Sequence, residues 1–431
     1  MAEHRESINW KHADPLLVSG SVQVIKTILE NGYEAFWVGG CVRDEYMGRN
    51  VSDIDITTSA LPDVITSLFD RVIPTGIQHG TVTVLAEGQS YEVTTYRVER
   101  GSDDHRHPAE IVFVNEIEKD LRRRDFTMNA MALGLEGQWV DPFGGRDDID
   151  KALIRCVGEA KVRFQEDALR MVRCIRFASV FGFMIAKDTW NGLLEVKKTL
   201  GWIAMERIRS ELDKMMSGPD PLRGLSLIKE SGLHLEMKVP FPYQDQEQDV
   251  SFIRAIQGVS ADQPDIRWAL LLMGCKISAA ESSDLLRKWT FSNRRRELIL
   301  GLVKFQEAWD YSLREAQPDA DRVLWIQLVL QMGVPAAEAW LQLQEGIRST
   351  GGTALVQIED ARVWLKGMQV KSLKELALTG DELLTSVNRR GGPWMKGLLS
   401  HLLFQTAAGY MQNDETVLIE EAKRVIQDEG I

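Results

Sequence analysis

Hydrophobic and polar residues alternate with a period of two in several short runs along the first third of the chain. Such alternation is typical of strands that bury one face. The runs at residues 81–86 and 90–97 are separated by Glu87-Gly88-Gln89, which predicts a hairpin. The predicted strands cover residues 35–38, 52–57, 81–86, 90–97 and 111–114. This part of the chain therefore predicts a sheet.

Apolar residues spaced three and four positions apart predict helices elsewhere. In the first half they predict helices over residues 16–30, 116–131 and 164–181. Beyond about residue 215 the pattern is almost entirely helical, with helical spacing at 251–287, 294–315, 321–331, 336–344, 352–365 and 381–387. We therefore predict an α+β chain, in which a mixed-sheet head precedes an all-helical remainder.

Two carboxylates in the second predicted strand carry the strongest candidate chemistry. Strand side chains alternate between faces, so Asp53 and Asp55 would project from one side, about 7 Å apart, while Ile54 and Ile56 face the core. Paired carboxylates on a rigid strand are suitable ligands for a divalent metal. They predict a metal site at the edge of the head.

A glycine pair and a third acid lie near these carboxylates in the predicted sheet. Gly39-Gly40 follows the first strand, and a glycine turn lets backbone N–H groups approach an anion. Glu92 lies inside the predicted hairpin between Tyr91 and Val93, where an acid needs a partner such as a metal. The head is thus expected to bind phosphate as well as metal.

Charged residues recur every three positions in the predicted helix at 164–181: Asp167, Arg170, Arg173 and Arg176. Cytosine and adenine both present an amino donor beside a ring-nitrogen acceptor, whereas uracil and guanine present the reverse. Asp167 only accepts and Arg170 only donates hydrogen bonds, so together they complement C and A. Unpaired polar groups would reject U and G. The two further arginines could hold a triphosphate or an RNA backbone.

Charge and composition narrow the classes of partner. The 431 residues carry a net charge of −12, which argues against a protein that grips nucleic acid over its whole surface. Residues 151–214 nevertheless have a net charge of +5, which leaves −17 for the remainder. This distribution indicates a basic cleft on an acidic body. The four cysteines are scattered, which argues against a disulfide framework or a structural zinc site.

Several motifs carry a resemblance to a known family. Gly39-Gly40-x-x-Arg43-Asp44 followed by Asp53-x-Asp55 resembles the active-site signature of the nucleotidyltransferase and poly(A) polymerase superfamily. Three later motifs resemble those of class II bacterial tRNA nucleotidyltransferases, the CCA-adding enzymes. They are Arg123-Arg124-Asp125-Phe126-Thr127-Met128-Asn129-Ala130, Glu166-Asp167-Ala168-Leu169-Arg170 and Glu206-Arg207-Ile208-x-x-Glu211. They occur in the family's order over about the first half of the chain.

The resemblance implies template-independent addition of CCA to the tRNA 3′ end from CTP and ATP, with release of pyrophosphate. Asp53 and Asp55, with Glu92 as a further catalytic acid, would hold two Mg²⁺ ions. The nucleotide would be bound by the triphosphate cradle Gly39, Gly40 and Arg43, by Arg124, by Asp125 and Asn129 at the sugar, and by Asp167, Arg170, Arg173 and Arg176. Glu206, Arg207 and Glu211 would orient Asp167 and Arg170 without touching substrate.

The resemblance also implies a division into four parts. These are a nucleotidyltransferase catalytic head at residues 1–149, a neck with the nucleotide-base template at 150–215, a helical body at 216–310 and a helical tail at 311–431 that binds tRNA. Residues 99–108 are expected to form a loop involved in the change from C to A addition. There Arg100 and Ser102 replace the family's usual glycine and aromatic residue, so enzymes that add only CC or only A stay as alternatives.

Two alternative functions are a poly(A) polymerase and a non-catalytic RNA- or nucleotide-binding module. A poly(A) polymerase shares the same head, but the acidic chain lacks the cationic track that long single strands favour. A non-catalytic RNA- or nucleotide-binding module would have no reason to group acids beside a phosphate. The charged amino-terminal residues and the absence of an apolar run of about 18 residues predict a cytoplasmic protein without membrane contact. The sequence leaves a homodimer open.

Overall fold

The computed structural model describes residues 10–100, 110–241, 249–312, 320–353 and 358–429. Contacts divide the chain into two compact units. The first unit comprises Met1–Met215 with Arg223–Phe241, and the second comprises Met216–Leu222 with Pro242–Ile431. Residues 1–215, predicted as head and neck, thus lie in one unit. The finer division at residues 149, 215 and 310 stays a prediction.

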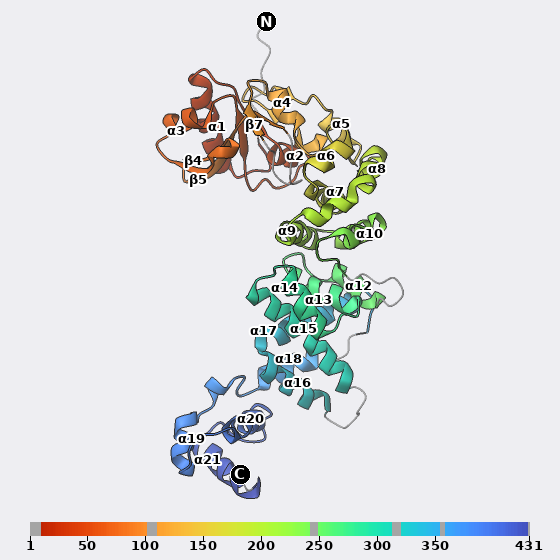
Figure 1. The fold of residues 1–431 in the computed structure, drawn as a ribbon. Helices are drawn as coiled ribbons and strands as arrows, with labels where there is room; N and C mark the ends of the chain where they lie inside the picture. Colours follow the sequence, from red (N-terminus) through yellow and green to blue (C-terminus); the bar gives the residue numbers. More distant parts are fainter. Residues whose placement is uncertain (1–9, 101–109, 242–248, 313–319, 354–357, 430–431) are drawn as a thin grey trace. The chain divides into compact units, whose positions relative to one another are not determined.

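A seven-stranded mixed sheet lies in the amino-terminal part of the first unit, and its strand order is β3-β4-β5-β2-β1-β8-β9. Its strands are β1 (Ala35–Val38), β2 (Asp55–Thr58), β3 (Val72–Gly76), β4 (Thr81–Ala86), β5 (Gln89–Thr95), β8 (Ala132–Leu133) and β9 (Trp139–Val140). Figure 1 labels β4 and β5 of this sheet. Among the neighbouring strands that the structure describes in this sheet, β2 and β5 are parallel and all other pairs are antiparallel. The predicted hairpin is confirmed as β4 and β5, joined by Glu87 and Gly88, which both have positive φ.

Helix α1 (Pro15–Glu30) covers part of this sheet and confirms the predicted helix at residues 16–30. It contacts β1, β4 and β5, and it buries Val24, Ile25 and Ile28. Two hydrogen bonds fix its position: the Tyr91 hydroxyl donates to a backbone carbonyl of α1 at 2.8 Å, and the Trp37 indole donates to Ser21 Oγ at 2.9 Å. One part of the core of the head therefore lies between α1 and the sheet, and a second buried cluster is formed by Val38, Leu121, Ala130, Ala132 and Val157.

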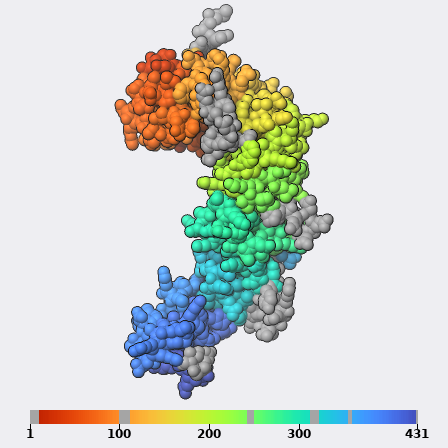
Figure 2. All heavy atoms as spheres, viewed as in Figure 1, coloured from red at the N-terminus to blue at the C-terminus, as the bar shows by residue number. Residues whose placement is uncertain are grey.

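The remaining elements of the first unit are mostly short helices. They are α2 (Gly40–Tyr46), α3 (Pro62–Leu68), α4 (Ile117–Arg122), α5 (Gly145–Asp150), α6 (Ala160–Glu166), α7 (Leu169–Phe181), α8 (Lys187–Val196), α9 (Met205–Met216), α10 (Pro221–Ser231) and α11 (Leu233–Glu236), with 3-10 helices at Ile77–His79, Thr127–Asn129 and Lys197–Trp202. Two strand pairs stand apart from the main sheet: β6 (Arg97–Arg100) with β7 (Glu110–Phe113), and β10 (Leu153–Ile154) with β11 (Met184–Ile185). Figure 2 shows the yellow atoms of this unit, around residues 150–180, adjoining the orange head.

Two predicted helices were wrong in extent. The helix expected at 116–131 ends with α4, because Asp125 accepts the Phe126 N–H and Phe126 is extended in a bridge to Cys156. The helix expected at 164–181 is broken at Asp167, which has an extended backbone between α6 and α7. Its carboxylate accepts the Leu169 N–H at 3.1 Å and so begins the second helix.

A predicted strand and a predicted loop each begin at a later residue in the structure than the sequence indicated. The strand expected at 52–57 begins only at Asp55, so Asp53 lies just before β2. The loop expected at 99–108 begins later, because Glu99 and Arg100 pair with β7 in strand β6. Ser102 lies outside the described residues.

The second unit is helical throughout its described ranges. Its elements are α12 (Val250–Gly258), α13 (Pro264–Gly274), α14 (Ala279–Lys288), α15 (Asn293–Ser312), α16 (Ala320–Met332), α17 (Val334–Ser349), α18 (Ile358–Gly367), a 3-10 helix at Leu373–Glu375, α19 (Gly380–Val387), α20 (Trp394–Ala407) and α21 (Glu415–Glu429). Trp309, Trp325 and Trp340 are fully buried; Trp325 and Trp340 pack against Phe305, and Trp309 packs against Trp340. These aromatic residues therefore form part of the core of this unit. None of the helices in the described ranges is long and apolar enough to span a membrane.

Candidate functional site

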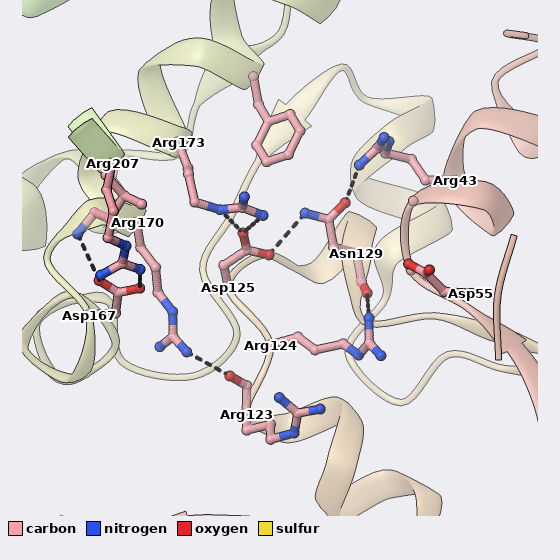
Figure 3. A pocket seen from close by; sticks show the side chains of 14 residues that line it. Arg43, Asp55, Arg123, Arg124, Asp125, Asn129, Asp167, Arg170, Arg173 and Arg207 are labelled. Atoms are coloured by element: carbon pink, nitrogen blue, oxygen red, sulfur yellow. Dashed lines mark hydrogen bonds and ion pairs between the residues drawn. The ribbon is translucent and has the colours of Figure 1, made fainter. Parts of the chain in front are cut away.

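A polar pocket of about 450 Å³ lies within the first unit (Figure 3). Three separate stretches of sequence build it, at residues 39–55, 123–129 and 167–207. Its lining consists of Gly39, Gly40, Arg43, Asp55, Arg123, Arg124, Asp125, Asn129, Asp167, Leu169, Arg170, Arg173, Phe177 and Arg207. Six arginines against three aspartates make it a site for a polyanion.

The glycine turn between β1 and α2 has a conformation that requires glycine. Gly39 has a φ of +78°, and a Cβ built there would lie 2.6 Å from Arg124 Nη1. The Gly39 N–H donates to the Met131 carbonyl at 3.1 Å, which ties the turn to the residue that precedes β8. The backbone here can therefore come close to the Arg124 guanidinium and to a ligand beside it.

Arg43 lies on α2 at the inner wall of the pocket and is buried. Its Nη1 donates to the Asn129 side-chain oxygen, and its Nε and Nη2 donate to the Asp44 carboxylate at 3.0 and 2.9 Å. Asn129 in turn donates from Nδ2 to Asp125 Oδ1 at 2.9 Å. The Arg43 guanidinium is thus held by Asn129 on one side and by Asp44 on another.

Asp55 begins β2 and lines the same pocket, directly across from Glu92 in the parallel pairing of β2 with β5. The pKa of Asp55 is raised to about 6, mainly by burial and also by the nearby charges of Asp53 and Glu92, whereas Arg124 opposes these effects. No described residue donates a hydrogen bond to its carboxylate. An acid crowded by other acids and left without a donor is suited to accept a cation.

The three predicted catalytic acids differ in position. Asp55 lines the pocket, whereas Asp53 and Glu92 are exposed and are not part of its lining. Asp53 accepts the Ser52 hydroxyl at 2.7 Å. Across the described ranges no three potential ligands lie together as a metal cluster. Asp53 and Asp55 fit the pattern in which one or two carboxylates hold a divalent cation that substrate phosphates and water complete.

Arg124 and its neighbour Arg123 are held by one buried carboxylate, that of Asp120. Arg123 Nε lies 2.9 Å from Asp120 Oδ1, and Arg124 Nη2 lies 3.7 Å from Oδ2. Burial lowers the pKa of Arg124, although Asp120 counteracts this effect. Arg124 Nη1 also donates to the Asn129 carbonyl at 3.4 Å. The family motif at residues 123–130 therefore puts a buried guanidinium beside the glycine turn.

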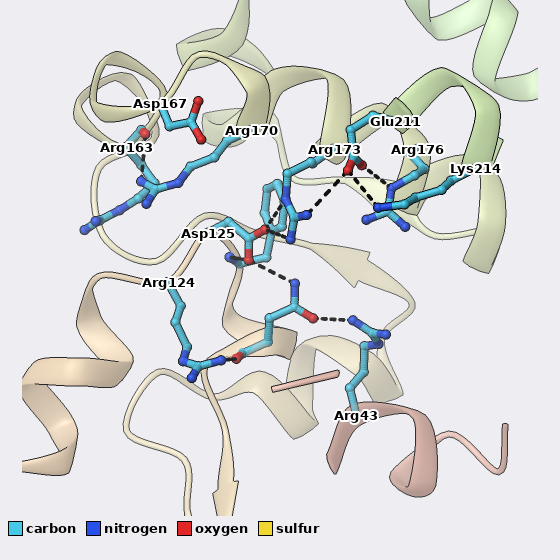
Figure 4. Close-up of polar contacts among 12 residues, drawn as sticks. Arg43, Arg124, Asp125, Arg163, Asp167, Arg170, Arg173, Arg176, Glu211 and Lys214 are labelled. Atoms are coloured by element: carbon cyan, nitrogen blue, oxygen red, sulfur yellow. Dashed lines mark hydrogen bonds and ion pairs between the residues drawn. The ribbon is translucent and has the colours of Figure 1, made fainter. Parts of the chain in front are cut away.

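Asp125 lies between the two ends of the pocket and is bound to Arg173 of α7 (Figure 4). Arg173 Nη2 and Nε lie 2.7 and 2.9 Å from Asp125 Oδ2. Burial alone would raise the pKa of Asp125, but Arg173 and the Asn129 amide hold it well below its usual range. Asp125 is therefore a charged, fully paired support, and its oxygens are already occupied by protein donors.

Glu211 on α9 continues this chain of contacts. It lies 2.5 Å from Arg176, 3.2 Å from Lys214 and 3.7 Å from Arg173. Although burial alone would raise the pKa of Glu211, these cations lower it, Arg176 most of all. Arg176 does not line the pocket, and it stacks on the Phe177 ring at 3.8 Å. Its predicted contact with nucleotide is therefore not supported by its position.

Asp167 and Arg170 lie at the opposite end of the pocket from Arg43 and Asp55 (Figure 3). Arg207 of α9 holds Asp167 through Nη2 and Oδ2 at 2.9 Å. Arg170 Nη1 lies 2.7 Å from Glu166, and its Nη2 donates to the Arg123 carbonyl at 3.0 Å. The side chains of the predicted base-reading pair are thus each fixed by a different partner.

Sequence analysis missed four residues of the lining: Arg123, Leu169, Phe177 and Arg207. Arg207 was expected to act only at a distance, yet it reaches the pocket through Asp167. Phe177 was not among the predicted site residues. Its spacing of seven residues from Arg170 is the signal that could have found it, since it puts both side chains on the same face of α7.

Three family models match different parts of the chain. Residues 35–155 match a poly A polymerase head domain, residues 182–246 a probable RNA- and SrmB-binding site of polymerase A, and residues 261–422 a putative second domain of tRNA nucleotidyltransferases. The first match contains the glycine turn, Asp55 and the motif at residues 123–130.

Curated relatives match over nearly the whole chain. A CCA-adding enzyme of Geobacillus sp. (strain WCH70) is 38% identical and covers 88% of this chain and 89% of its own length. A CCA-adding enzyme of Limosilactobacillus reuteri is 34% identical over 96% of this chain and 98% of its own. Among solved structures, the Bacillus stearothermophilus CCA-adding enzyme in complex with CTP has a TM-score of 0.80 at 31% identity, and the match covers 97% of this chain and 99% of that one.

Proposed function

The chain belongs to the family of CCA-adding tRNA nucleotidyltransferases, and on that premise we propose that its pocket selects CTP and ATP and joins them to the 3′ end of tRNA. The Bacillus stearothermophilus relative, solved with CTP, supports nucleotide binding in this fold at 31% identity. One observation carries the proposal: Asp55, the glycine turn and the pair Asp167 and Arg170 line one pocket. Phosphate chemistry and base selection can therefore act on one bound nucleotide.

The head is proposed to bind the triphosphate. The Gly40 N–H, with the guanidinium groups of Arg43 and Arg124, would bind the phosphates, whereas the Gly39 N–H is already bonded to the Met131 carbonyl and Gly39 contributes the turn itself. Asp53 and Asp55 would hold a divalent cation, which we take to be Mg²⁺. When bound, the cation would lower the pKa of the tRNA 3′-hydroxyl and stabilise charge on the α-phosphate during displacement of pyrophosphate. Glu92 would act on Asp55 only through its charge.

Base selection is proposed for the opposite end of the pocket. Arg207 fixes Asp167 as an acceptor, and Glu166 with the Arg123 carbonyl fixes Arg170 as a donor. C and A complement this pair, whereas U and G would leave buried polar groups unpaired. Asp125 and Asn129, expected at the sugar, are engaged with Arg173 and Arg43, so we assign them to support of these cations.

The four-part division extends the proposal to the rest of the chain. The tail at residues 311–431 would bind tRNA, and the match of residues 261–422 to a tRNA nucleotidyltransferase domain supports this role. A cytoplasmic location, where tRNA is matured, belongs to the same proposal. A homodimer, left open by the sequence, would be recognised from the mass measured by light scattering.

The proposal is tested by incubating the protein and MgCl₂ with tRNA that ends at the discriminator base or at CC. Each labelled nucleotide is supplied alone, and then CTP with ATP. We expect both substrates to be completed to CCA, with no product in EDTA. Products that stop at CC would mean that Arg100 and Ser102 have removed A addition. Extension of CC ends alone would indicate an A-adding enzyme, and long A tracts a poly(A) polymerase.

A further inference from the structure

Two aromatic rings on α7 are stacked beside the pocket. The Phe177 and Phe181 rings lie 5.4 Å apart with planes inclined by 15°. Phe177 lines the pocket but is only 3% exposed, whereas Phe181, one helical turn later, is half-buried and does not line it. A stacked pair that is mostly covered cannot offer a free face to a nucleobase.

Guanidinium groups cover these rings. Arg43 from α2 lies 4.8 Å from the centre of the Phe181 ring and 5.2 Å from that of Phe177. Arg176 and Arg173 lie 3.8 and 5.4 Å from the Phe177 ring, and Arg49 lies 5.0 Å from the Phe181 ring. Ring faces attract cations, most strongly where water is excluded. The stack therefore attaches the Arg43 side chain of α2 to helix α7.

Arg43 is left with hydrogen-bonding capacity despite these contacts. A guanidinium has five N–H groups. Three are used: one by Asn129 and two by Asp44. No acceptor among the described residues takes the other two. Asn129 and Asp44 hold the edge of the Arg43 guanidinium, and the two phenylalanine rings hold its face. The two remaining N–H groups therefore point in one fixed direction.

We propose that the stacked pair Phe177 and Phe181 is a positioning platform that holds the Arg43 guanidinium ready for a phosphate of the incoming nucleotide. This inference rests on the proposed function, because it takes the bound nucleotide as the source of that phosphate. Both rings belong to α7, the helix that carries Arg170, and Phe177 lies seven residues after Arg170. The stack of Phe177 and Phe181 thus links the position of Arg43, which would bind the phosphates, to the position of helix α7, which carries Arg170.

Phe181→Leu tests the platform because it removes a ring face, keeps apolar volume and alters no residue of the pocket lining. We expect the KM for CTP and for ATP to rise equally, by about two- to tenfold. The value of kcat and the preference for CTP over UTP should stay near those of the wild type. Phe181→Tyr, which restores an aromatic face, should restore the KM.

An inhibitor that carries phosphates but no nucleobase distinguishes the positioning role of Phe181 from a general effect on packing. Tripolyphosphate should inhibit Phe181→Leu more weakly than wild type by the same factor as the rise in KM, while the inhibition constant of cytidine stays unchanged. In a double-mutant cycle, Phe181→Leu should have no further effect on tripolyphosphate in an Arg43→Ala background. An effect that persists without Arg43 would overturn the proposal.

Phe183→Leu is the matched control. Phe183 packs against the Phe181 ring at 5.6 Å, it is buried, and no guanidinium among the described residues lies over its ring. We expect Phe183→Leu to lower the melting temperature as Phe181→Leu does, without raising the KM. Equal rises in KM for the two variants would assign the effect to packing. Failure of the wild type to extend tRNA would count against the proposed function, whereas wild-type KM values in Phe181→Leu would count against the platform alone.

Discussion

The carboxylate of Asp125 and the guanidinium of Arg173 form a close ion pair, with Arg173 Nη2 2.7 Å from Asp125 Oδ2, that joins the motif at residues 123–130 to helix α7. Asn129 and the Phe126 N–H bind the other oxygen of the carboxylate at 2.9 and 2.8 Å. The pair therefore holds the wall of the pocket that lies between Arg43 and Asp167.

Replacement of Asp125 by Asn should destabilise the protein, because the neutral amide leaves the Arg173 charge without its nearest partner. Loss of one member of a fully buried pair costs about 3–5 kcal/mol in the free energy of unfolding, and the cost here should be smaller because the Arg173 side chain is 31% exposed. Urea denaturation at pH 7 measures it. Glu195→Gln breaks the exposed pair with Lys161 and should change stability little. A similar small change in Asp125→Asn would contradict the assignment.

The pH dependence of this pair has a defined sign. The pKa of Asp125 is depressed in the folded protein, so its contribution to stability is complete above the ordinary carboxyl pKa of about 4 and is lost as pH falls below that value. The difference in unfolding free energy between wild type and Asp125→Asn should therefore shrink below pH 4. A difference that stays constant would show that charge is not its source.

Asp55 should show the opposite pH dependence. Its folded pKa of about 6 lies above the ordinary value, so deprotonation costs stability as pH rises from about 4 through 6. Asp55→Asn should gain about 1–3 kcal/mol of unfolding free energy at pH 7.5 and nothing at pH 4. MgCl₂ should raise the melting temperature of the wild type at pH 7.5 but not at pH 4.5, and it should leave Asp55→Asn unchanged at both.

Nucleotide transfer should depend on the same carboxylate. We expect Asp55→Asn to lower kcat for incorporation of CMP into tRNA by at least about a thousandfold, since a bound cation supplies several kcal/mol of transition-state stabilisation. Filter binding of tRNA should stay at the wild-type level, which excludes misfolding as the cause. Turnover within tenfold of the wild type would remove Asp55 from the metal site.

Selection of C and A should depend on Asp167. Asp167→Ala removes the acceptor, and the ratio of kcat/KM for CTP to that for UTP should fall by about 100-fold. Arg207→Met should lower the same ratio by less, because Asp167 stays but loses the partner at 2.9 Å that fixes it. Asp188→Ala, in an exposed pair with Arg155, is the control of the same residue type. Unchanged selectivity in Asp167→Ala would contradict the base-reading role.

Local sequence patterns predicted the strands and the glycine turn because those features depend on near neighbours. The hairpin of β4 and β5 follows from alternation and from Glu87-Gly88, and α1 follows from its apolar spacing. Both elements bury one face against the sheet. Patterns of this kind therefore predicted most of the framework that holds Asp55.

Contacts between distant residues explain what the patterns did not predict. Phe126 is extended because it bridges to Cys156, 30 residues later, so the spacing of residues 116–131 suggested a helix that does not form. The interaction of Asp125 with Arg173 instead of a sugar, and of Arg207 with Asp167, depends on how α7 and α9 pack. No local spacing contains that information.

The ion pair of Asp125 with Arg173 limits how this protein can be recombined with its relatives. An exchange of residues 1–149 would import a buried carboxylate and leave its native guanidinium behind on α7, so a hybrid would depend on a cation of matching reach in the recipient. An exchange that ends after residue 241 carries both members of the pair and all the residues that line the pocket. A transplanted piece that ends before α7 is therefore too short, whereas residues 1–241 carry the ion pair together with the whole pocket lining.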